Sequence, residues 1–133
     1  MKVIQFVPTL DSGGVEQGVI EMSKALVANQ HESHVVSAGG RLVDELIQSG
    51  TQHHKWDLHK KNFLTFRLVK PLRKWIISMS PDVVHVRSRM PAWIVWQALK
   101  DIPLDKRPSL VSTIHGLYSI NFYSAIMSKP QNI

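Results

Sequence analysis

The chain has 133 residues, enough for one domain with its own hydrophobic core. Its 44% hydrophobic and 20% charged residues exclude a disordered or fibrous chain, and the lack of cysteine excludes disulfides and thiolate metal sites. No apolar run approaches the roughly 18 to 20 residues that span a bilayer, and the amino terminus is unlike a signal peptide, so we expect a soluble, cytoplasmic protein. The net charge of +6 indicates an anionic partner, such as a phosphate-bearing substrate, nucleic acid or a membrane surface.

Short apolar, β-branched runs alternate with segments of helical period through the first half of the chain. The first strand ends in a turn-rich segment, where Ser12 is placed to cap the helix that follows. The pattern predicts strands at residues 2–8, 34–37 and 52–56, and helices at residues 15–29 and 41–48.

The second half continues this alternation after a long basic helical stretch. Pro81 and Asp82 restart the pattern, and Pro91 opens the next helix. The pattern predicts helices at residues 64–79, 91–99 and 119–127, and strands at residues 83–86 and 109–114. Strands separated by helices in this order predict an α/β fold with a doubly wound parallel sheet, whose ligands bind beyond the carboxyl ends of the strands.

The loop after the first strand carries two adjacent glycines, Gly13 and Gly14, directly before a helix. Paired glycines allow a ligand to approach the backbone, and the amides at the helix start attract a phosphate or a sugar hydroxyl. The alternative is a tight turn that needs glycine for its own conformation. Gly13, Gly14 and Gly18 do not match the G-x-G-x-x-G spacing, and no acidic residue follows the second strand, so a dinucleotide-binding dehydrogenase is disfavoured.

The loop after the fourth strand contains Arg87, Ser88 and Arg89. Two guanidinium groups at a strand exit form a fork suited to phosphate or carboxylate, and Ser88 adds a hydroxyl. Solvated arginines at the rim of the sheet are the alternative. His85 lies within the preceding apolar strand, where we expect a hydrogen-bonded core residue.

The loop after the fifth strand contains His115, Gly116 and Tyr118. A histidine followed by glycine at a strand exit is well placed to donate to a sugar hydroxyl or phosphate, so we assign His115 a functional role. Tyr118 is left open between ligand contact and packing. The histidines give no matched set of metal ligands, and no catalytic triad or carboxylate pair neighbours these loops, so no metal site is expected.

A basic stretch spans residues 55–75 and is interleaved with tryptophan, phenylalanine and leucine. Such a surface is suited to an anionic membrane, with contacts from Lys60, Lys61, Arg67, Lys70, Arg73 and Lys74. A solvated helix face explains the same pattern. Nucleic-acid binding is not expected, because no recognition motif accompanies the charge.

Four motifs at strand exits together resemble the amino-terminal domain of family 4 glycosyltransferases. They are Ser12-Gly13-Gly14-Val15-Glu16, residues 37–42, residues 81–89, and Thr113-Ile114-His115-Gly116. The nearest similarity is to bacterial enzymes that build lipopolysaccharide core or capsule, and it spans nearly the whole chain.

The resemblance implies that residues 1–133 form the acceptor-side, Rossmann-like half of a GT-B fold, with the active site in the cleft to a second domain. Transfer in this family retains the anomeric configuration and needs no divalent metal. By matching motif, the resemblance assigns His115 to the transferred sugar. The donor or acceptor would be contacted by Gly13, Gly14, Glu16, Arg87, Ser88, Arg89, Gly116 and Tyr118.

The chain stops where another strand would be expected, so we expect a cut near a domain boundary, without the donor-binding domain. The expected partners are a nucleotide-sugar held through that domain, a glycan or lipid-linked acceptor, and the inner face of the cytoplasmic membrane. No cofactor and no nucleic acid are expected. The alternative is a non-catalytic Rossmann-like module that binds an anionic ligand or partner.

Overall fold

The computed structural model describes residues 1–11, 13–58 and 67–112. These residues contain a five-stranded, all-parallel sheet with the strand order β3-β2-β1-β4-β5. The strands are β1 (Lys2–Phe6), β2 (Glu32–Ser37), β3 (Gln52–Lys55), β4 (Val83–Val86) and β5 (Ser109–Ser112). The predicted parallel α/β sheet is therefore confirmed.

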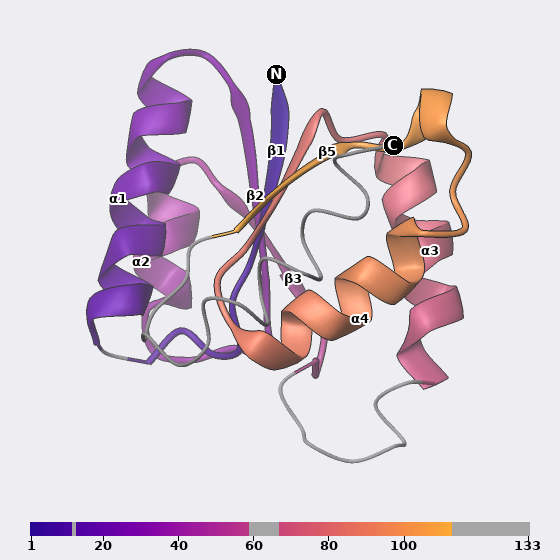
Figure 1. The fold of residues 1–133 in the computed structure, drawn as a ribbon. Helices are drawn as coiled ribbons and strands as arrows, with labels where there is room; N and C mark the ends of the chain where they lie inside the picture. Colours follow the sequence, from indigo (N-terminus) through magenta and orange to yellow (C-terminus); the bar gives the residue numbers. More distant parts are fainter. Residues whose placement is uncertain (12, 59–66, 113–133) are drawn as a thin grey trace.

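Helices cover both faces of this sheet. They are α1 (Gly14–Ala28), α2 (Val43–Gln48), α3 (Val69–Met79) and α4 (Arg89–Leu99), and a short 3₁₀ turn, η2 (Leu104–Lys106), precedes β5. Figure 1 shows α1 and α2 on one face and α3 and α4 on the other. None of the helices in the described ranges is long and apolar enough to cross a membrane.

Two hydrophobic clusters lie on opposite faces of the sheet, because alternate strand residues point to opposite sides. Ile4 and Phe6 belong to the larger cluster, which α3 and α4 cover. Val7 and Val35 belong to the smaller cluster beneath α1 and α2. Because both faces are buried, the strands are apolar throughout, which explains their continuous apolar runs in the sequence.

Several element boundaries differ from the sequence prediction. β2 begins two residues early, at Glu32, because it pairs with β1 from Lys2 onward. α4 begins at Arg89 rather than at Pro91, since a helix tolerates proline in its first turn, where the missing N–H has no acceptor. α3 begins at Val69 instead of residue 64. Residue 12, residues 59–66 and residues 113–133 lie outside the described residues, and with them the Ser12 cap, the end of the fifth strand and the predicted helix at 119–127.

The strand order has one reversal of direction, at β1. From β1 the chain adds β2 and β3 on one side of the sheet and then β4 and β5 on the other. The loops that follow β1 and β4 therefore leave adjacent strand ends in opposite directions. Doubly wound sheets bind ligands in the crevice between two such loops. This topological switch point lies between Phe6 and Val86, which are paired in register.

Candidate binding edge of the sheet

The loops that follow β1 and β2 are joined by backbone hydrogen bonds at the carboxyl edge of the sheet. Leu10 N–H donates to the Gly39 carbonyl (2.9 Å), and Leu42 N–H donates to the Leu10 carbonyl (2.8 Å). Ala38 N–H donates to the Pro8 carbonyl, also at 2.9 Å. These hydrogen bonds join the two loops into one unit. The second loop therefore helps to fix the position of the first loop, and with it any ligand that the first loop binds.

Gly40 makes this close approach of the two loops possible. Its φ is 150°, and a Cβ there would lie 2.4 Å from the carbonyl carbon and oxygen of Leu10. Side-chain-bearing residues rarely adopt that backbone angle, and the clash is with backbone that cannot move aside. The sequence analysis gave Gly40 no role of its own, although a glycine pair at the exit of the second strand is the signal that marks it.

Gly13 and Gly14 differ in why they are glycine. Gly13 is the N-cap of α1 with φ 145°. Gly14 is the first residue of α1, and a Cβ at Gly14 would meet no atom within 4 Å. Gly13 is therefore required by the turn, whereas Gly14 leaves open space in front of the helix start. Of the two interpretations that the sequence left open, the tight turn applies to Gly13, and room for a ligand to approach applies to Gly14.

Glu16 folds back onto the same helix start. Its Oε2 lies 2.5 Å from where a Cβ on Gly13 would stand. A carboxylate at this end of a helix interacts favourably with the exposed amides and the positive end of the dipole. The Glu16 carboxylate therefore offsets part of the positive potential at the start of α1, which would otherwise attract an anionic ligand.

Arg87 lies inside the protein rather than at its surface. The side chain is 8% exposed, its Nε donates to Gln5 Oε1 at 3.2 Å, and its Nη2 lies 3.6 Å from the sulfur of Met22. Gly18 makes room for it, since a Cβ on Gly18 would lie 3.4 Å from Arg87 Nη1. The side chain of Arg87 is therefore used inside the protein, because its place at the exit of β4 directs it against the inner face of α1, and its predicted ligand contact stays a prediction.

Gln5, Ser23 and His85 complete this polar layer between β1, β4 and α1. Gln5 Nε2 donates to Ser23 Oγ at 3.0 Å, and both residues are fully buried. His85 pairs in register with Gln5 and is buried, as the sequence predicted. Burial and the neighbouring Arg87 charge lower the pKa of His85 to about 4, so the imidazole is neutral near pH 7. The sequence analysis missed Gln5, for which the signal is a single polar residue within an apolar strand.

Ser88 and Arg89 mark the start of α4 beside this layer. Ser88 is the N-cap with extended backbone (φ −156°, ψ 169°), and no side-chain hydrogen bond caps the helix there. The Ser88 side chain is half-buried. Arg89 is the first helical residue, and its side chain is outside the described part of the chain. Ser88 thus lies at the edge as predicted, and the predicted contact by Arg89 stays a prediction.

The loop that carries His115, Gly116 and Tyr118 lies outside the described residues. The position of β5 is nevertheless defined, and β4 separates β5 from β1. The ends of the first and fifth strands therefore do not adjoin. The end of β4 is the neighbour of the Gly13–Gly14 loop, because β4, not β5, pairs with β1.

Comparison with known proteins identifies the family of this sheet and its loops. A family model described as Glycosyltransferase Family 4 matches residues 12–132. The chain belongs to glycosyltransferase family 4. A crystal structure of a glycosyltransferase from Rickettsia africae ESF-5 has a TM-score of 0.76 and 33% sequence identity, and the match covers 95% of this chain and 34% of that chain. The comparison with curated proteins gave no match.

The family 4 chain thus spans about a third of the length of that glycosyltransferase. Its five-stranded parallel sheet with flanking helices matches one half of a GT-B fold. The resemblance found in the sequence is confirmed at the level of family and fold.

The basic stretch of this family 4 domain is only partly a free surface. Arg73 points inward, where its Nε donates to the Ala98 carbonyl (2.9 Å) and its Nη2 to the Gln97 carbonyl (3.1 Å) and Asp101 Oδ2 (3.0 Å). These acceptors lie at the carboxyl end of α4, where a cation is favourable. The guanidinium of Arg73 is therefore already engaged within the protein, and its predicted membrane contact stays a prediction.

The remaining basic residues divide into two groups. Arg67, Lys70 and Lys74 are exposed, whereas Lys60 and Lys61 lie outside the described residues. Trp56 and Trp75, which gave the stretch its amphipathic pattern, pack against the larger hydrophobic cluster. The two tryptophans thus belong to the core, and among the described residues of the stretch Arg67, Lys70 and Lys74 present their charge to solvent.

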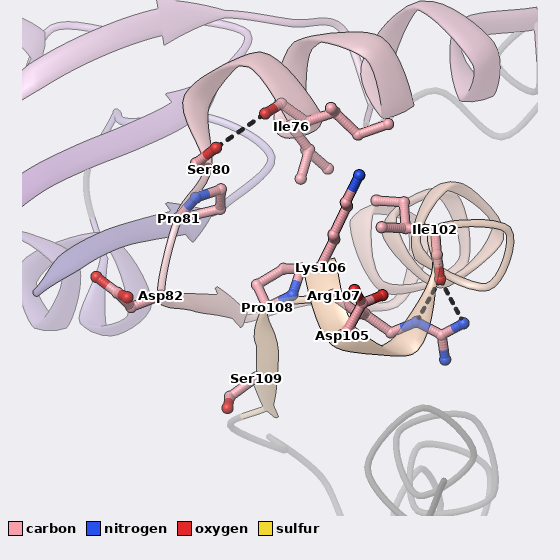
Figure 2. Close-up of a pocket in the computed structure, with 11 residues that line it drawn as sticks. Ile76, Ser80, Pro81, Asp82, Ile102, Asp105, Lys106, Arg107, Pro108 and Ser109 are labelled. Atoms are coloured by element: carbon pink, nitrogen blue, oxygen red, sulfur yellow. Dashed lines mark hydrogen bonds between the residues drawn. The ribbon is translucent and has the colours of Figure 1, made fainter.

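A hollow of about 600 Å³ lies at the opposite edge of the sheet. Figure 2 shows Lys106 reaching between Ile76 and Ile102, with Asp82 and Pro108 at the amino ends of β4 and β5. The amino ends of the strands are remote from the carboxyl edge that carries the Gly13–Gly14 loop. This hollow is therefore separate from the binding edge that the family motifs define.

Proposed function

We propose that this chain is the acceptor-side half of a retaining glycosyltransferase, which transfers a sugar from a nucleotide-sugar to a glycan or lipid-linked acceptor. The observation that carries the proposal is membership of glycosyltransferase family 4 together with a span of about a third of the related glycosyltransferase. A second domain would bind the nucleotide-sugar and close against the carboxyl edge of the sheet. Lipopolysaccharide core or capsule synthesis in the cytoplasm is the proposed setting.

The geometry of the Gly13–Gly14 loop supports a role on the acceptor side. Open space in front of Gly14 leaves the first amides of α1 accessible to a ligand. The Glu16 carboxylate beside Gly13 offsets part of the positive potential there. A sugar hydroxyl, which can donate to a carboxylate and accept from an amide, suits this site better than a second phosphate would.

The chemistry requires stabilisation of the departing nucleotide diphosphate, on which negative charge develops. Fixed amides, helix ends and cations are the groups that supply it without metal or cofactor. This chain would contribute the start of α1, the half-buried Ser88 at the start of α4, and the loop with His115 beside the transferred sugar. The cations that neutralise the diphosphate would come from the second domain.

Turnover by the full-length enzyme tests this proposal. Gly14→Val should lower transfer by about tenfold or more while leaving stability nearly unchanged, because the added side chain fills the space in front of α1 without a clash. His115→Ala should also lower turnover. Wild-type turnover by both variants would contradict the site, and the 133-residue chain alone should show no transfer from any nucleotide-sugar.

A non-catalytic module for an anionic ligand is the second candidate. The charge of +6 and the exposed Arg67, Lys70 and Lys74 favour it. The gene sequence after Ile133 separates the two candidates. A second βα-rich segment there favours the enzyme, whereas a stop codon favours the module.

A further inference from the structure

Two histidines form a hydrogen-bonded pair beneath α3. Nδ1 of His34, on β2, lies 3.0 Å from Nε2 of His54, on β3, and the two rings are stacked with centroids 5.2 Å apart. The other nitrogen of His34, Nε2, lies 2.5 Å from a Glu32 carboxylate oxygen, so this nitrogen carries a proton and donates it. The His34 side chain is 3% exposed, which keeps water from replacing these partners.

The hydrogen bond between His34 Nδ1 and His54 Nε2 requires a proton on only one of these two nitrogens. When His34 is neutral, its Nδ1 accepts from His54 Nε2–H; when His34 is charged, its Nδ1–H donates to His54. If both rings are imidazolium, two N–H groups face each other across 3.0 Å and the hydrogen bond is lost. The pair therefore stays intact with no charge or with one positive charge, and is broken by two.

The groups that face the pair come from three strands and from α3. From β2, Glu32 accepts from His34, and this hydrogen bond, with the nearby Lys2 charge, lowers the pKa of Glu32. From β1, Lys2 Nζ lies 3.6 Å from the same carboxylate. On β3, the adjacent His53 is turned to the other face, where its Nε2 is hydrogen-bonded to Ser37 Oγ at 2.6 Å. From α3, the neutral ring of Trp75 meets His54.

A second positive charge on the pair meets no further counterion among the residues that the structure describes. Among the described residues, Glu32 is the carboxylate in contact with the pair, and it is already shared with Lys2. Burial, and then the charges of His34 and His53, lower the pKa of His54. Since that pKa lies below the unfolded value of 6.5, the unfolded chain binds the extra proton more readily, and stability is lost as the pH falls below 6.5.

The orientation of His54 is coupled to α3 through tryptophan. The His54 and Trp75 rings meet edge to face with centroids 4.9 Å apart, and Trp75 lies 5.9 Å from Trp56. α3 is in turn fastened to α4 by Arg73. A change in the orientation of the His54 ring therefore affects the packing of α3 and, through Arg73, of α4. The first residues of α4 lie at the binding edge.

We propose that Glu32, His34, His54 and Trp75 form a pH-sensitive latch that holds α3 on the sheet near neutral pH and loosens it on mild acidification. The latch opens when the second proton reaches the histidine pair, because His54 then turns away from His34 and releases the edge of Trp75. Its operation does not depend on glycosyl transfer.

Tryptophan fluorescence and imidazole ¹⁵N spectra of the 133-residue chain test the latch from about pH 7.5 to about pH 5. The unaltered chain should show a reversible fluorescence change while its far-UV circular dichroism stays native. His54→Gln, which keeps a hydrogen-bonding amide but cannot titrate, should lose that change. His53→Gln, the matched control on the opposite face, should retain it, and Trp75→Phe should remove it by deleting the reporter.

The ¹⁵N spectra keep the test decisive if His54→Gln does not fold. At about pH 7.5, Nε2 of His34 should carry its proton, and the pKa of His54 should lie below that of a free imidazole. Retention of the full fluorescence change by folded His54→Gln overturns the latch. The latch is also overturned if both rings become imidazolium while the signals from Trp75 stay unchanged.

Discussion

At the scale of single residues, Gly40 and Gly14 differ in what their positions tolerate. Gly40→Ala should lower the free energy of unfolding by about 2 to 6 kcal/mol, since strained backbone and a clash with the Leu10 carbonyl each cost roughly 1 to 3 kcal/mol. Gly14→Ala should change it by less than about 1 kcal/mol, because its Cβ meets open space. Urea unfolding of both variants measures the difference. Equal stability of the two would show that the loops separate without cost.

The buried imidazole of His85 makes stability depend on pH. Its pKa is lowered to about 4, so between pH 4 and the unfolded value of 6.5 the unfolded chain binds more protons than the folded one. The free energy of unfolding should therefore fall by roughly 3 kcal/mol from this residue as the pH drops through that range. The difference between the chain and His85→Gln in urea unfolding at each pH isolates the contribution. If the free energies of unfolding of the two proteins changed with pH in the same way, His85 would protonate freely in the folded state.

Arg87 shows how a residue type suited to ligand binding is used for packing. Its guanidinium joins the end of β4 to α1 through Gln5 and Met22, and Gly18 leaves space for it. A buried cation needs hydrogen-bond acceptors, which Gln5 supplies in place of a carboxylate. Arg87 therefore acts on the binding edge indirectly, by fixing the helix that carries the Gly13–Gly14 loop.

At the scale of secondary-structure elements, Arg73 connects α3 to the carboxyl end of α4. Arg73→Met should lower the free energy of unfolding by about 2 to 4 kcal/mol, because it deletes charge-assisted hydrogen bonds to Ala98 and Gln97 while keeping the aliphatic stem. Lys74→Met, at the exposed neighbouring position, should change it by less than about 0.5 kcal/mol. Thermal or urea unfolding compares the two. A similar loss in both variants would contradict the capping role.

α1 illustrates what periodicity does and does not reveal about an element. Its apolar spacing predicted a helix at 15–29, and the helix runs from Gly14 to Ala28. Its buried face also includes Ser23, which accepts from Gln5. No helical pattern predicts a buried serine, because its partner lies on a strand eighteen residues earlier in the chain.

At the scale of the whole molecule, the exposed charge of α3 predicts attraction to anionic membranes. Replacing both Lys70 and Lys74 by alanine should weaken sedimentation with anionic vesicles at low salt by about tenfold or more, since each lysine near such a surface contributes roughly 1 kcal/mol. Arg73→Met should leave it unchanged, because that side chain is directed into the protein. Equal binding to anionic and neutral vesicles, or no binding at low salt, would count against membrane association.

Much of the architecture followed from local patterns. Apolar runs and helical periods predicted every strand and α-helix of the described residues, with boundaries that differ by up to five positions, because both faces of a parallel sheet are buried and leave a continuous apolar signal. The motifs at strand exits predicted family 4, which the family match confirmed. The glycine pair was also visible in the sequence, but only the structure showed that Gly13, with φ 145°, is the one that the turn requires.

The sequence by itself determined the kinds of elements, their order and the family. The tertiary structure decided which strands adjoin, and so placed β4 rather than β5 beside β1. It also turned Arg87 and Arg73 inward and paired His34 with His54. Local propensity acts over a few residues, whereas these outcomes depend on groups 20 to 82 positions apart in the chain, whose meeting is decided by how the layers pack.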